Sequence, residues 1–433
     1  MATSSTPTVI LDFSSLDSAL GTDVGRTNEA VQTAAADVTG NPVERAHLVA
    51  SYNTAMGKLR EENKGPGIMS SAENALASRL QSYFVERAMT EAPNAAQPVP
   101  GQVLEVKFDN LDVFGWLPTG LKTIFKVKPH PWIMPAPTAQ PIGNRFRAAL
   151  FSDWGTGLYG APHITKSIQN DAAGFDMMMH LGDTYYSGGD NEIRDRLMEA
   201  FPHGRPDVIR LALNGNHEMY SGGKGYFSAA LPFLSQASSC FAYQNDHWLL
   251  VGLDTAYIDH NLDEPDKNGV NKTNQVAWLK GLVDAAGARK VILFSHHQPF
   301  SQLDKQGPKI VAAIGHDLLQ RIHAWFFGHE HRCVIYQPHD SFGLKARCIG
   351  HGGFPEFRTR FSGPSSDDYR WISLAKNDNA PAAVVLDGAN KFIDDNGARY
   401  SPHGYVTLRF NGSECIEDYF DAGGTRLRDS EVL

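Results

Sequence analysis

The sequence has few cysteines, no long apolar run and no excess of basic residues. Its four cysteines are scattered and include no CxxC pair, which argues against a disulfide framework or a zinc ribbon. No apolar stretch approaches the roughly 20 residues that cross a bilayer, so we expect no association with membranes. The 39 Lys and Arg are outnumbered by 48 Asp and Glu, giving a net charge of −9. This acidic balance disfavours nucleic acid as a partner.

The amino terminus also lacks the features of a targeting segment. It begins Met-Ala-Thr-Ser-Ser-Thr-Pro, without a basic stretch followed by an apolar one, so no signal peptide is indicated. We therefore expect a cytoplasmic protein, with secretion left open if a leader has been removed. A hydrophobic share of 42% and a charged share of 20% are ordinary for a folded chain. The length of 433 residues is enough for two or more hydrophobic cores.

The first 145 residues differ in pattern from the rest of the chain. Apolar residues three and four apart predict one helix over residues 42–59 and another over residues 70–87. Short strands are predicted at 103–108 and 123–127, before a proline-rich stretch over residues 129–141. We therefore divide the chain into an N-terminal, mainly helical extension (1–145) and a second domain (146–433). The extension is the candidate for homo-oligomer or docking contacts.

After residue 145, short apolar runs alternate with helical or loop segments, which is typical of an α/β fold. Residues 365–393 carry few periodic signals, and we predict a long loop there. Each of five apolar runs is followed by metal-ligand side chains: Ala148–Phe151 by Asp153, Met177–Met179 by Asp183, Leu211–Leu213 by Asn216, Val291–Phe294 by His296, and Trp325–Phe327 by His329 and His331. Ligands of α/β sheets collect at the carboxyl ends of strands, so this pattern predicts a polynuclear metal site.

The two aspartates supply hard oxygen ligands. Carboxylates suit Fe(III), Mn(II) or Zn(II), although either Asp153 or Asp183 alone is also typical of a helix N-cap. Tyr186 lies three residues after Asp183, a spacing that puts both side chains on one side of a helical turn. Ordinary packing is the alternative for Tyr186, and it is the role that we expect of Tyr185.

The histidines after the last two strands supply nitrogen ligands. His329 and His331 are two residues apart, so on an extended strand end they point the same way. His296 and His297 compete for one ligand position, because alternation sends neighbouring side chains to opposite faces. His296 follows the apolar strand directly, whereas the spacing to the following proline favours His297.

The Gly-Asn-His-Glu stretch completes the set of candidates. The amide oxygen of Asn216 can bind a metal, and His217 can face the group bound there. By itself this tetrapeptide is also typical of a turn, since Gly-Asn favours positive φ. Five such stretches in order, each at a strand end, make a chance arrangement improbable.

The order Asp…Gly-Asp…Gly-Asn-His-Glu…His…Gly-His-x-His resembles the calcineurin-like metallophosphoesterases. Gly155 stands where most of these have a histidine, and Tyr186 adds a tyrosine to the second motif. This combination resembles the purple acid phosphatases, in particular the small, tartrate-resistant type. The resemblance covers about residues 146–353, with Ser152 in place of the family's usual glycine. It implies a four-layer α/β/β/α metallophosphoesterase sandwich.

The resemblance also implies two bound metal ions, with Fe(III) on the Tyr186 side and Fe(II), Zn(II) or Mn(II) on the other. His217 would hydrogen-bond the phosphoryl group and could protonate the leaving oxygen. The metal ligands would be Asp153, Tyr186 and His331 for the first ion, Asn216, His296 and His329 for the second, and Asp183 as the bridge between them.

On this resemblance the protein hydrolyses phosphate monoesters by attack of a metal-activated hydroxide, and its partner is a small phosphorylated substrate. A phosphodiesterase or nucleotidase on the same site is an alternative, because the motifs do not identify the leaving-group pocket. A catalytically decayed metal-binding or partner-binding protein is a further alternative. The complete ligand set together with His217 argues against decay.

Overall fold

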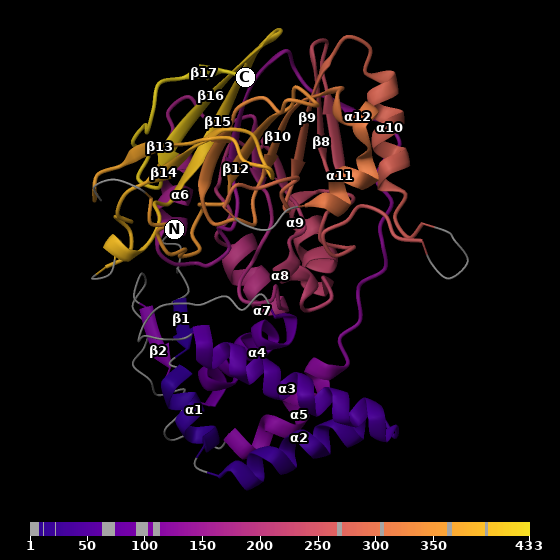
Figure 1. The fold of residues 1–433 in the computed structure, drawn as a ribbon, viewed down its shortest axis with the longest axis vertical. Coiled ribbons are helices and arrows are strands. Elements are labelled where there is room, and N and C mark those ends of the chain that lie inside the picture. Colours follow the sequence, from indigo (N-terminus) through magenta and orange to yellow (C-terminus); the bar gives the residue numbers. More distant parts are fainter. Residues whose placement is uncertain are drawn as a thin grey trace.

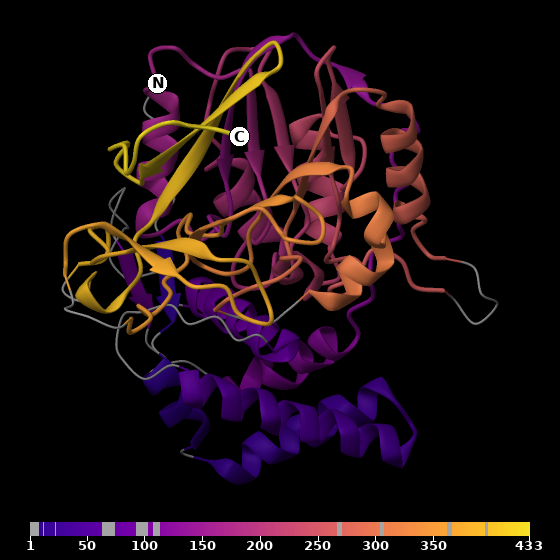
Figure 2. The same cartoon turned by 45° about the horizontal axis from the view of Figure 1, so that its top comes forward.

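The computed structural model describes most of the chain. The described residues are 8–11, 13–21, 23–62, 74–91, 103–106, 113–265, 271–303, 307–361, 366–394 and 397–433. Figure 1 shows helices of the amino-terminal part below two β-sheets, and Figure 2 shows the same arrangement after rotation.

The amino-terminal part is mainly helical, as predicted. Its helices are α1 (Phe13–Gly21), α2 (Val24–Val38), α3 (Pro42–Glu62), α4 (Ala75–Glu91) and α5 (Val113–Phe125). Strands β1 (Thr8–Leu11) and β2 (Val103–Val106) form a small parallel sheet beside them. Helix α4 is capped by Asn74, whose Oδ1 accepts from the backbone N–H of Leu76 and Ala77. Residues 70–73, where the sequence suggests a capping box, lie outside the described residues.

Two larger sheets follow. The six-stranded sheet has the order β17-β16-β15-β4-β5-β6, and the nine-stranded sheet has the order β13-β14-β11-β12-β10-β9-β8-β7-β3. The strands of the first are β4 (Arg145–Phe151), β5 (Met177–His180), β6 (Ile209–Ala212), β15 (Gly404–Asn411), β16 (Glu414–Asp421) and β17 (Glu431–Val432). The strands of the second are β3 (Gln140–Pro141), β7 (Phe241–Gln244), β8 (Trp248–Gly252), β9 (Lys290–Ser295), β10 (Ile322–Phe327), β11 (Cys333–Tyr336), β12 (Lys345–Ile349), β13 (Arg370–Leu374) and β14 (Ala383–Asp387).

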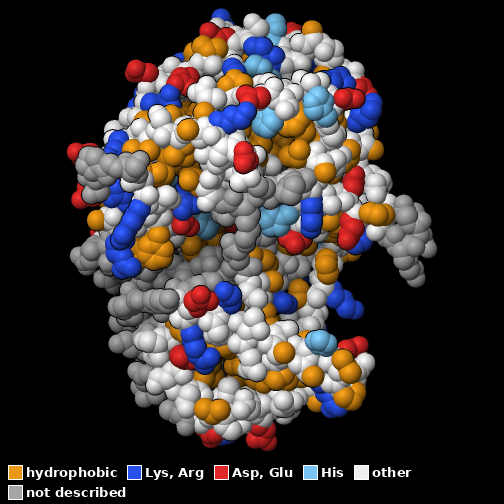
Figure 3. Space-filling model, in the orientation of Figure 1, with side chains coloured by type: hydrophobic (Ala, Val, Ile, Leu, Met, Phe, Trp, Pro, Cys, Tyr) orange, Lys and Arg blue, Asp and Glu red, His pale blue; other side chains and the backbone are white. Residues whose placement is uncertain are grey.

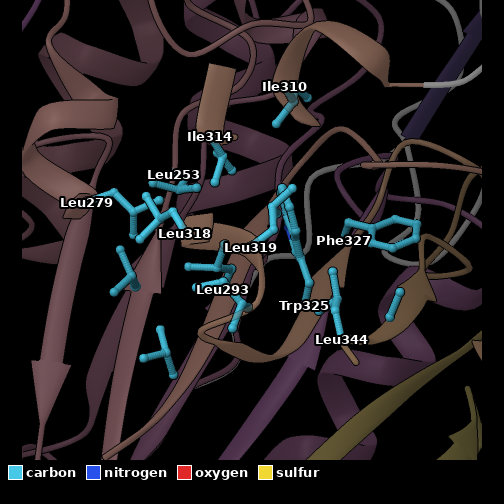
Figure 4. Close-up of a cluster of buried hydrophobic side chains, with 14 of the residues drawn as sticks. Leu253, Leu279, Leu293, Ile310, Ile314, Leu318, Leu319, Trp325, Phe327 and Leu344 are labelled. Atoms are coloured by element: carbon cyan, nitrogen blue, oxygen red, sulfur yellow. The ribbon is translucent and has the colours of Figure 1, made fainter. Parts of the chain in front are cut away.

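Helices cover the outer face of each sheet. The six-stranded sheet is covered by α6 (Gly160–Gln169), η1 (Ile193–Met198), η2 (Tyr226–Ala230) and α9 (Leu231–Leu234). The nine-stranded sheet is covered by α10 (Gln275–Ala285), α11 (Pro308–Ile314) and α12 (His316–Leu319), whose leucines and isoleucines pack on Leu293, Trp325 and Phe327 (Figure 4). Short elements α7 (Asp190–Glu192), α8 (Asn216–Met219) and η3 (Gly397–Arg399) lie in the connections.

Alternate residues of the central strands belong to different cores. In β4, Ala148 and Leu150 face the second sheet, while Ala149 and Phe151 face the helices. Side chains alternate along a strand, so a strand buried on both faces has to be apolar throughout. The successive layers are helices, six-stranded sheet, nine-stranded sheet and helices, which confirms the predicted α/β/β/α sandwich.

The amino-terminal helices share their core with the sandwich. Their buried side chains form one cluster that also contains Tyr185, Tyr186 and Phe354. Polar contacts tie α4 to the same place: the hydroxyls of Ser82 and Ser187 lie 2.7 Å apart, and Ser82 donates to Glu192. The extension is therefore packed against the segment after β5. A boundary near residue 145 stays a prediction.

Charges are mixed on the face shown in Figure 3, where Lys and Arg alternate with Asp and Glu. Among the described residues, no helix combines the length and apolar character that a transmembrane span requires.

Two element predictions are wrong. The strand predicted at 123–127 overlaps the last turn of α5, where Leu117, Leu121 and Ile124 are buried four and three residues apart, the spacing of a helix face. The loop predicted at 365–393 contains β13 and β14. Strand β14 pairs with β11, a partner close to it only in the folded chain, and such pairing outweighs weak local preference.

A buried ion pair joins the two sheets. Arg347 of β12 and Glu417 of β16 are 5% and 0% exposed, and their guanidinium and carboxylate meet at 2.8 Å. The Tyr419 hydroxyl donates to the same carboxylate at 3.1 Å, and Arg347 donates to the Tyr336 carbonyl. Burial would lower the pKa of Arg347, but Tyr419 and Glu417 raise it above its usual value. The Arg347 guanidinium is thus held charged in an apolar interior.

Replacing Glu417 with Gln should destabilise the sandwich by about 3–5 kcal/mol, because Arg347 would be left buried without its counter-charge. Urea denaturation followed by fluorescence measures this loss. The double variant Arg347→Met/Glu417→Leu removes both charges and serves as the control. Equal destabilisation by the single and double variants would contradict this account.

Candidate active site

Both sheets deliver polar side chains to one edge of the sandwich. Strands β4, β5 and β6 run parallel, as do β8, β9 and β10 in the other sheet. The carboxyl ends of parallel strands lie on the same side, and the residues after β4, β5, β6, β9 and β10 meet there. The candidates that the structure brings together are Asp153, Asp183, Asn216, His217, His296, His329 and His331.

The backbone turns sharply at three of these residues. Asp153, Asp183 and His329 have φ of 54°, 77° and 68°, in the left-handed region that residues with a Cβ seldom adopt. Such a conformation costs on the order of 1–3 kcal/mol per residue and is found mostly at functional sites. The turns aim the side chains inward instead of continuing the strands.

Two glycines allow the turns to approach one another. A Cβ on Gly215 would lie 2.1 Å from Asp183 Oδ1, and a Cβ on Gly328 would lie 1.9 Å from Ser152 Oγ and 2.6 Å from Asp153 Oδ2. These distances are far inside van der Waals contact. Glycine is therefore required before Asn216 and His329 because the aspartates occupy the space of a side chain.

The first donor group gathers two carboxylates, one phenol and one imidazole. Tyr185 Oη lies 3.0 Å from Asp153 Oδ1, 3.2 Å from Asp183 Oδ2 and 3.0 Å from His331 Nε2. His331 Nε2 is 3.4 Å from Asp153 Oδ1. Ligands about 2.0–2.1 Å from a tetrahedral ion are separated by roughly 3.3 Å, so these spacings suit a metal ion.

The second donor group combines one carboxylate, one amide oxygen and two imidazoles. His296 Nε2 lies 3.3 Å from Asp183 Oδ1 and 2.9 Å from Asn216 Oδ1. His329 Nδ1 lies 3.0 Å from the same amide oxygen. Asp183 thus contributes Oδ1 to this group and Oδ2 to the other, so its single carboxylate lies between the two.

The charges of this cluster depend on one another. Burial would raise the pKa of Asp183, but the imidazoles of His296 and His217 hold it well below its usual value. Burial would lower the pKa of His296, yet Asp183 raises it to about 9. Desolvation dominates at His329 and lowers its pKa well below the usual value. One buried carboxylate is therefore stabilised by the positive charge beside it.

Tyr185, not Tyr186, lies in the cluster, so the predicted position of Tyr186 is wrong. Directly after Asp183, Thr184 forms a parallel bridge with Gly155, and a single turn closed by the Gly188 N–H and the Thr184 carbonyl follows. In this arrangement the Tyr185 hydroxyl contacts both Asp153 and Asp183. The ring of Tyr186 packs in the core shared with the amino-terminal helices, 5.7 Å from the Arg196 guanidinium. Because Tyr185 and Tyr186 are adjacent, the sequence alone does not show which of the two rings lies beside the aspartates.

His296 and His297 occupy different surroundings. His296 Nδ1 donates to the Leu181 carbonyl, 3.0 Å away, and its Nε2 faces the cluster. Since a carbonyl only accepts, Nδ1 carries a proton, and Nε2 is the nitrogen that would reach a metal ion once its own proton is released. His297 lies beside Thr255 instead, with Nδ1 2.9 Å from Oγ1. His296, and not His297, therefore points a ring nitrogen at Asp183 and Asn216.

His217 faces the shared carboxylate. Its Nδ1 hydrogen-bonds the Tyr186 carbonyl, and its Nε2 is 3.8 Å from Asp183 Oδ2. Burial lowers the pKa of His217. Next to it, Glu218 Oε2 accepts from the backbone N–H of Gly215 and Asp183 at 2.9 and 3.2 Å. The glutamate thus fastens the loop that carries His217 to the end of β5.

The similarity of this chain to known proteins is concentrated in the same region. Residues 146–333 match the family model of calcineurin-like phosphoesterases. No curated protein matches the chain.

Solved structures show distant similarity. One is a purple acid phosphatase from seeds of yellow lupin (Lupinus luteus), with 15% identity and a TM-score of 0.46. The match covers 70% of this chain and 55% of the lupin chain, so this chain spans little more than half the length of that enzyme. Another is GAP50, the anchor in the inner membrane complex of Plasmodium, with 12% identity, a TM-score of 0.46 and coverage of 67% and 88%. The family match and the sandwich together show that residues 146–333 form a calcineurin-like phosphoesterase domain.

Proposed function

We propose that this protein is a dinuclear-metal phosphoesterase that hydrolyses phosphate monoesters. The observation that carries the proposal is the position of Asp183, whose two carboxylate oxygens face two separate donor groups. A carboxylate between two cations lowers their mutual repulsion, which is the role that this position would give Asp183. The family match supports hydrolysis of a phosphate ester.

The donor chemistry suggests which metals would bind. A phenolate and carboxylates are hard ligands that suit Fe(III), while an amide oxygen with two imidazoles suits Fe(II), Zn(II) or Mn(II). The first ion would be held by Asp153, Tyr185 and His331, the second by Asn216, His296 and His329, with Asp183 shared. When bound, such a pair lowers the pKa of a coordinated water and neutralises the charge of the phosphoryl group.

Side chains of the site prepare it for this chemistry. Burial and the carboxylates of Asp153 and Asp183 raise the pKa of Tyr185, so the phenol keeps its proton until a cation reverses the balance of charge. His296, with its pKa of about 9, also has to release a proton to become a ligand. Metal uptake is therefore coupled to proton release.

His217 is the group that would handle the leaving oxygen. The Tyr186 carbonyl accepts from Nδ1, which fixes the ring and points Nε2 toward Asp183. A histidine held in this way can hydrogen-bond a phosphoryl oxygen and donate a proton to the departing alkoxide. Glu218 positions it through the backbone N–H groups that it accepts.

A cleft gives a small phosphorylated substrate access to the site. Its volume is about 460 Å³, and its lining includes Asn216 and His329 of the second donor group. Tyr220 and Tyr257 form part of the wall beyond them. The phosphoryl group would lie against the metal ligands and the alcohol portion in the cleft.

Metal removal tests the proposal as a whole. The purified chain should contain at least two metal ions, lose hydrolysis of p-nitrophenyl phosphate on chelation, and regain it when metal is restored. Elemental analysis and the rate of nitrophenol release measure both. Faster turnover of bis(p-nitrophenyl) phosphate would replace the monoesterase with a diesterase. A chain that takes up no metal would overturn the proposal.

His217→Ala should retain both metals and lose activity by about 10²–10⁴-fold, the usual contribution of a positioned acid or base. The control is His203→Ala, which changes an exposed histidine outside the donor groups. Steady-state kinetics and metal content are measured together. Unchanged activity of the His217 variant would remove this residue from the mechanism.

The two adjacent tyrosines form a matched pair of variants. Tyr185→Phe should abolish any visible tyrosinate-to-iron absorption band and weaken metal binding by at least about tenfold, as loss of a ligand should exceed loss of an outer partner. Tyr186→Phe should leave the band in place, because its ring lies in the helical core. Absorption spectra and metal titrations decide. Loss of the band in Tyr186→Phe alone would make Tyr186, and not Tyr185, the metal ligand. A colourless protein that contains zinc or manganese would contradict the proposal of Fe(III) in the first donor group.

A further inference from the structure

A second group of histidines lies beside the donor groups. His260, His297 and His329 each offer a ring nitrogen, and these nitrogens all lie within 4.8 Å of one another. The ring centroids are 3.9 Å apart for His260 and His297, 4.6 Å for His297 and His329, and 5.3 Å for His260 and His329. Ring nitrogens this close together can converge on one shared cation.

His297 is oriented for such a role. It is fully buried, and Thr255 Oγ1 lies 2.9 Å from its Nδ1. Its Nε2 is also buried and has no hydrogen-bond partner among the residues that the structure describes, which is costly for a polar atom. When Nδ1 donates to the hydroxyl, Nε2 carries the lone pair, the tautomer found in metal-binding histidines held by an outer partner.

His260 reaches the group from a tight turn. Ile258 and Asn261 pair across this turn, and His260 between them has φ of 54°. The three ligand candidates Asp153, Asp183 and His329 share this left-handed conformation. A strained backbone at a histidine beside a buried, unpartnered nitrogen is consistent with a site that is built to hold a ligand.

We propose that His260, His297 and His329 bind a third divalent ion of the Zn(II) class, separate from the metal pair. Three imidazoles suit zinc and leave a fourth position open. His329 presents Nδ1 to Asn216 at 3.0 Å, so its Nε2 is the nitrogen left for the third ion. Its ring would then bridge two ions as an imidazolate, with its N–H proton released to solvent. The proposal rests on the proposed function only through this shared histidine.

The third ion would lie at the wall of the substrate cleft. His260 and His329 both line the cleft, together with Asn216 of the second donor group. Its open coordination position could bind an oxygen of the substrate next to the reacting phosphoryl group. Substrates with a second anionic group would gain most from it.

Cobalt(II) alone serves as the probe, because its visible absorption reports imidazole coordination independently of turnover. The full chain is stripped of metal, titrated with cobalt, and its bound cobalt counted by elemental analysis. His260→Gly removes the ring at a φ that glycine adopts freely, and His297→Gln tests a second ligand. The control is His316→Ala, which changes an exposed histidine of α12. Asp183→Asn removes the carboxylate that the two proposed metal ions share.

We expect three bound cobalt ions in the unmodified chain and the His316 control, and two in each of the His260 and His297 variants. Two ions in every one of these proteins would overturn the third site and leave the pair intact. Two in the unmodified chain and one in His260→Gly would make His260 a ligand of the pair, which also overturns it. A single ion that survives Asp183→Asn and is lost in His260→Gly would support this site and overturn the pair.

Discussion

The architecture of the site depends on one buried carboxylate. Asp183 is 1% exposed, and a carboxylate in such surroundings is stable only beside positive charge or strong donors. His296 and His217 supply that environment from different elements, and the backbone N–H of His217 adds a hydrogen bond of 3.1 Å. Left-handed turns, and glycines that leave room for close approach, bring these groups into contact with the Asp183 carboxylate. Packing of the two sheets therefore has to be accurate to a fraction of an ångström at this edge.

The rest of the structure holds that edge in place. Strands buried on both faces align the two sheets, and the Arg347–Glu417 pair connects them through the interior. The amino-terminal helices contribute from outside, since their core includes the rings of Tyr185 and Tyr186. One tyrosine thus faces the donor groups and its neighbour anchors the helices. Packing of the extension is consequently linked to the position of a candidate ligand.

The sequence predicted much of this from local patterns. Apolar runs ending in Asp, Asn or His located the strands, and the spacing of apolar residues located α3 and α4. Patterns failed where the deciding partner is distant in the chain. Strand β14 depends on β11, and Tyr185 was passed over because a helical turn was expected after Asp183. His260 carried no signal at all, since it follows no strand and belongs to no motif.

What the sequence determined by itself was the set of chemical groups and their order: carboxylates, amide and imidazoles at the ends of buried strands. A short stretch of sequence is enough for this, because the spacing of its apolar residues indicates both its burial and its secondary structure. Only the tertiary structure decided which of two adjacent tyrosines and which of two adjacent histidines enter the cluster. That choice depends on how the ends of strands from two different sheets meet, so it is set by contacts between residues far apart in the chain.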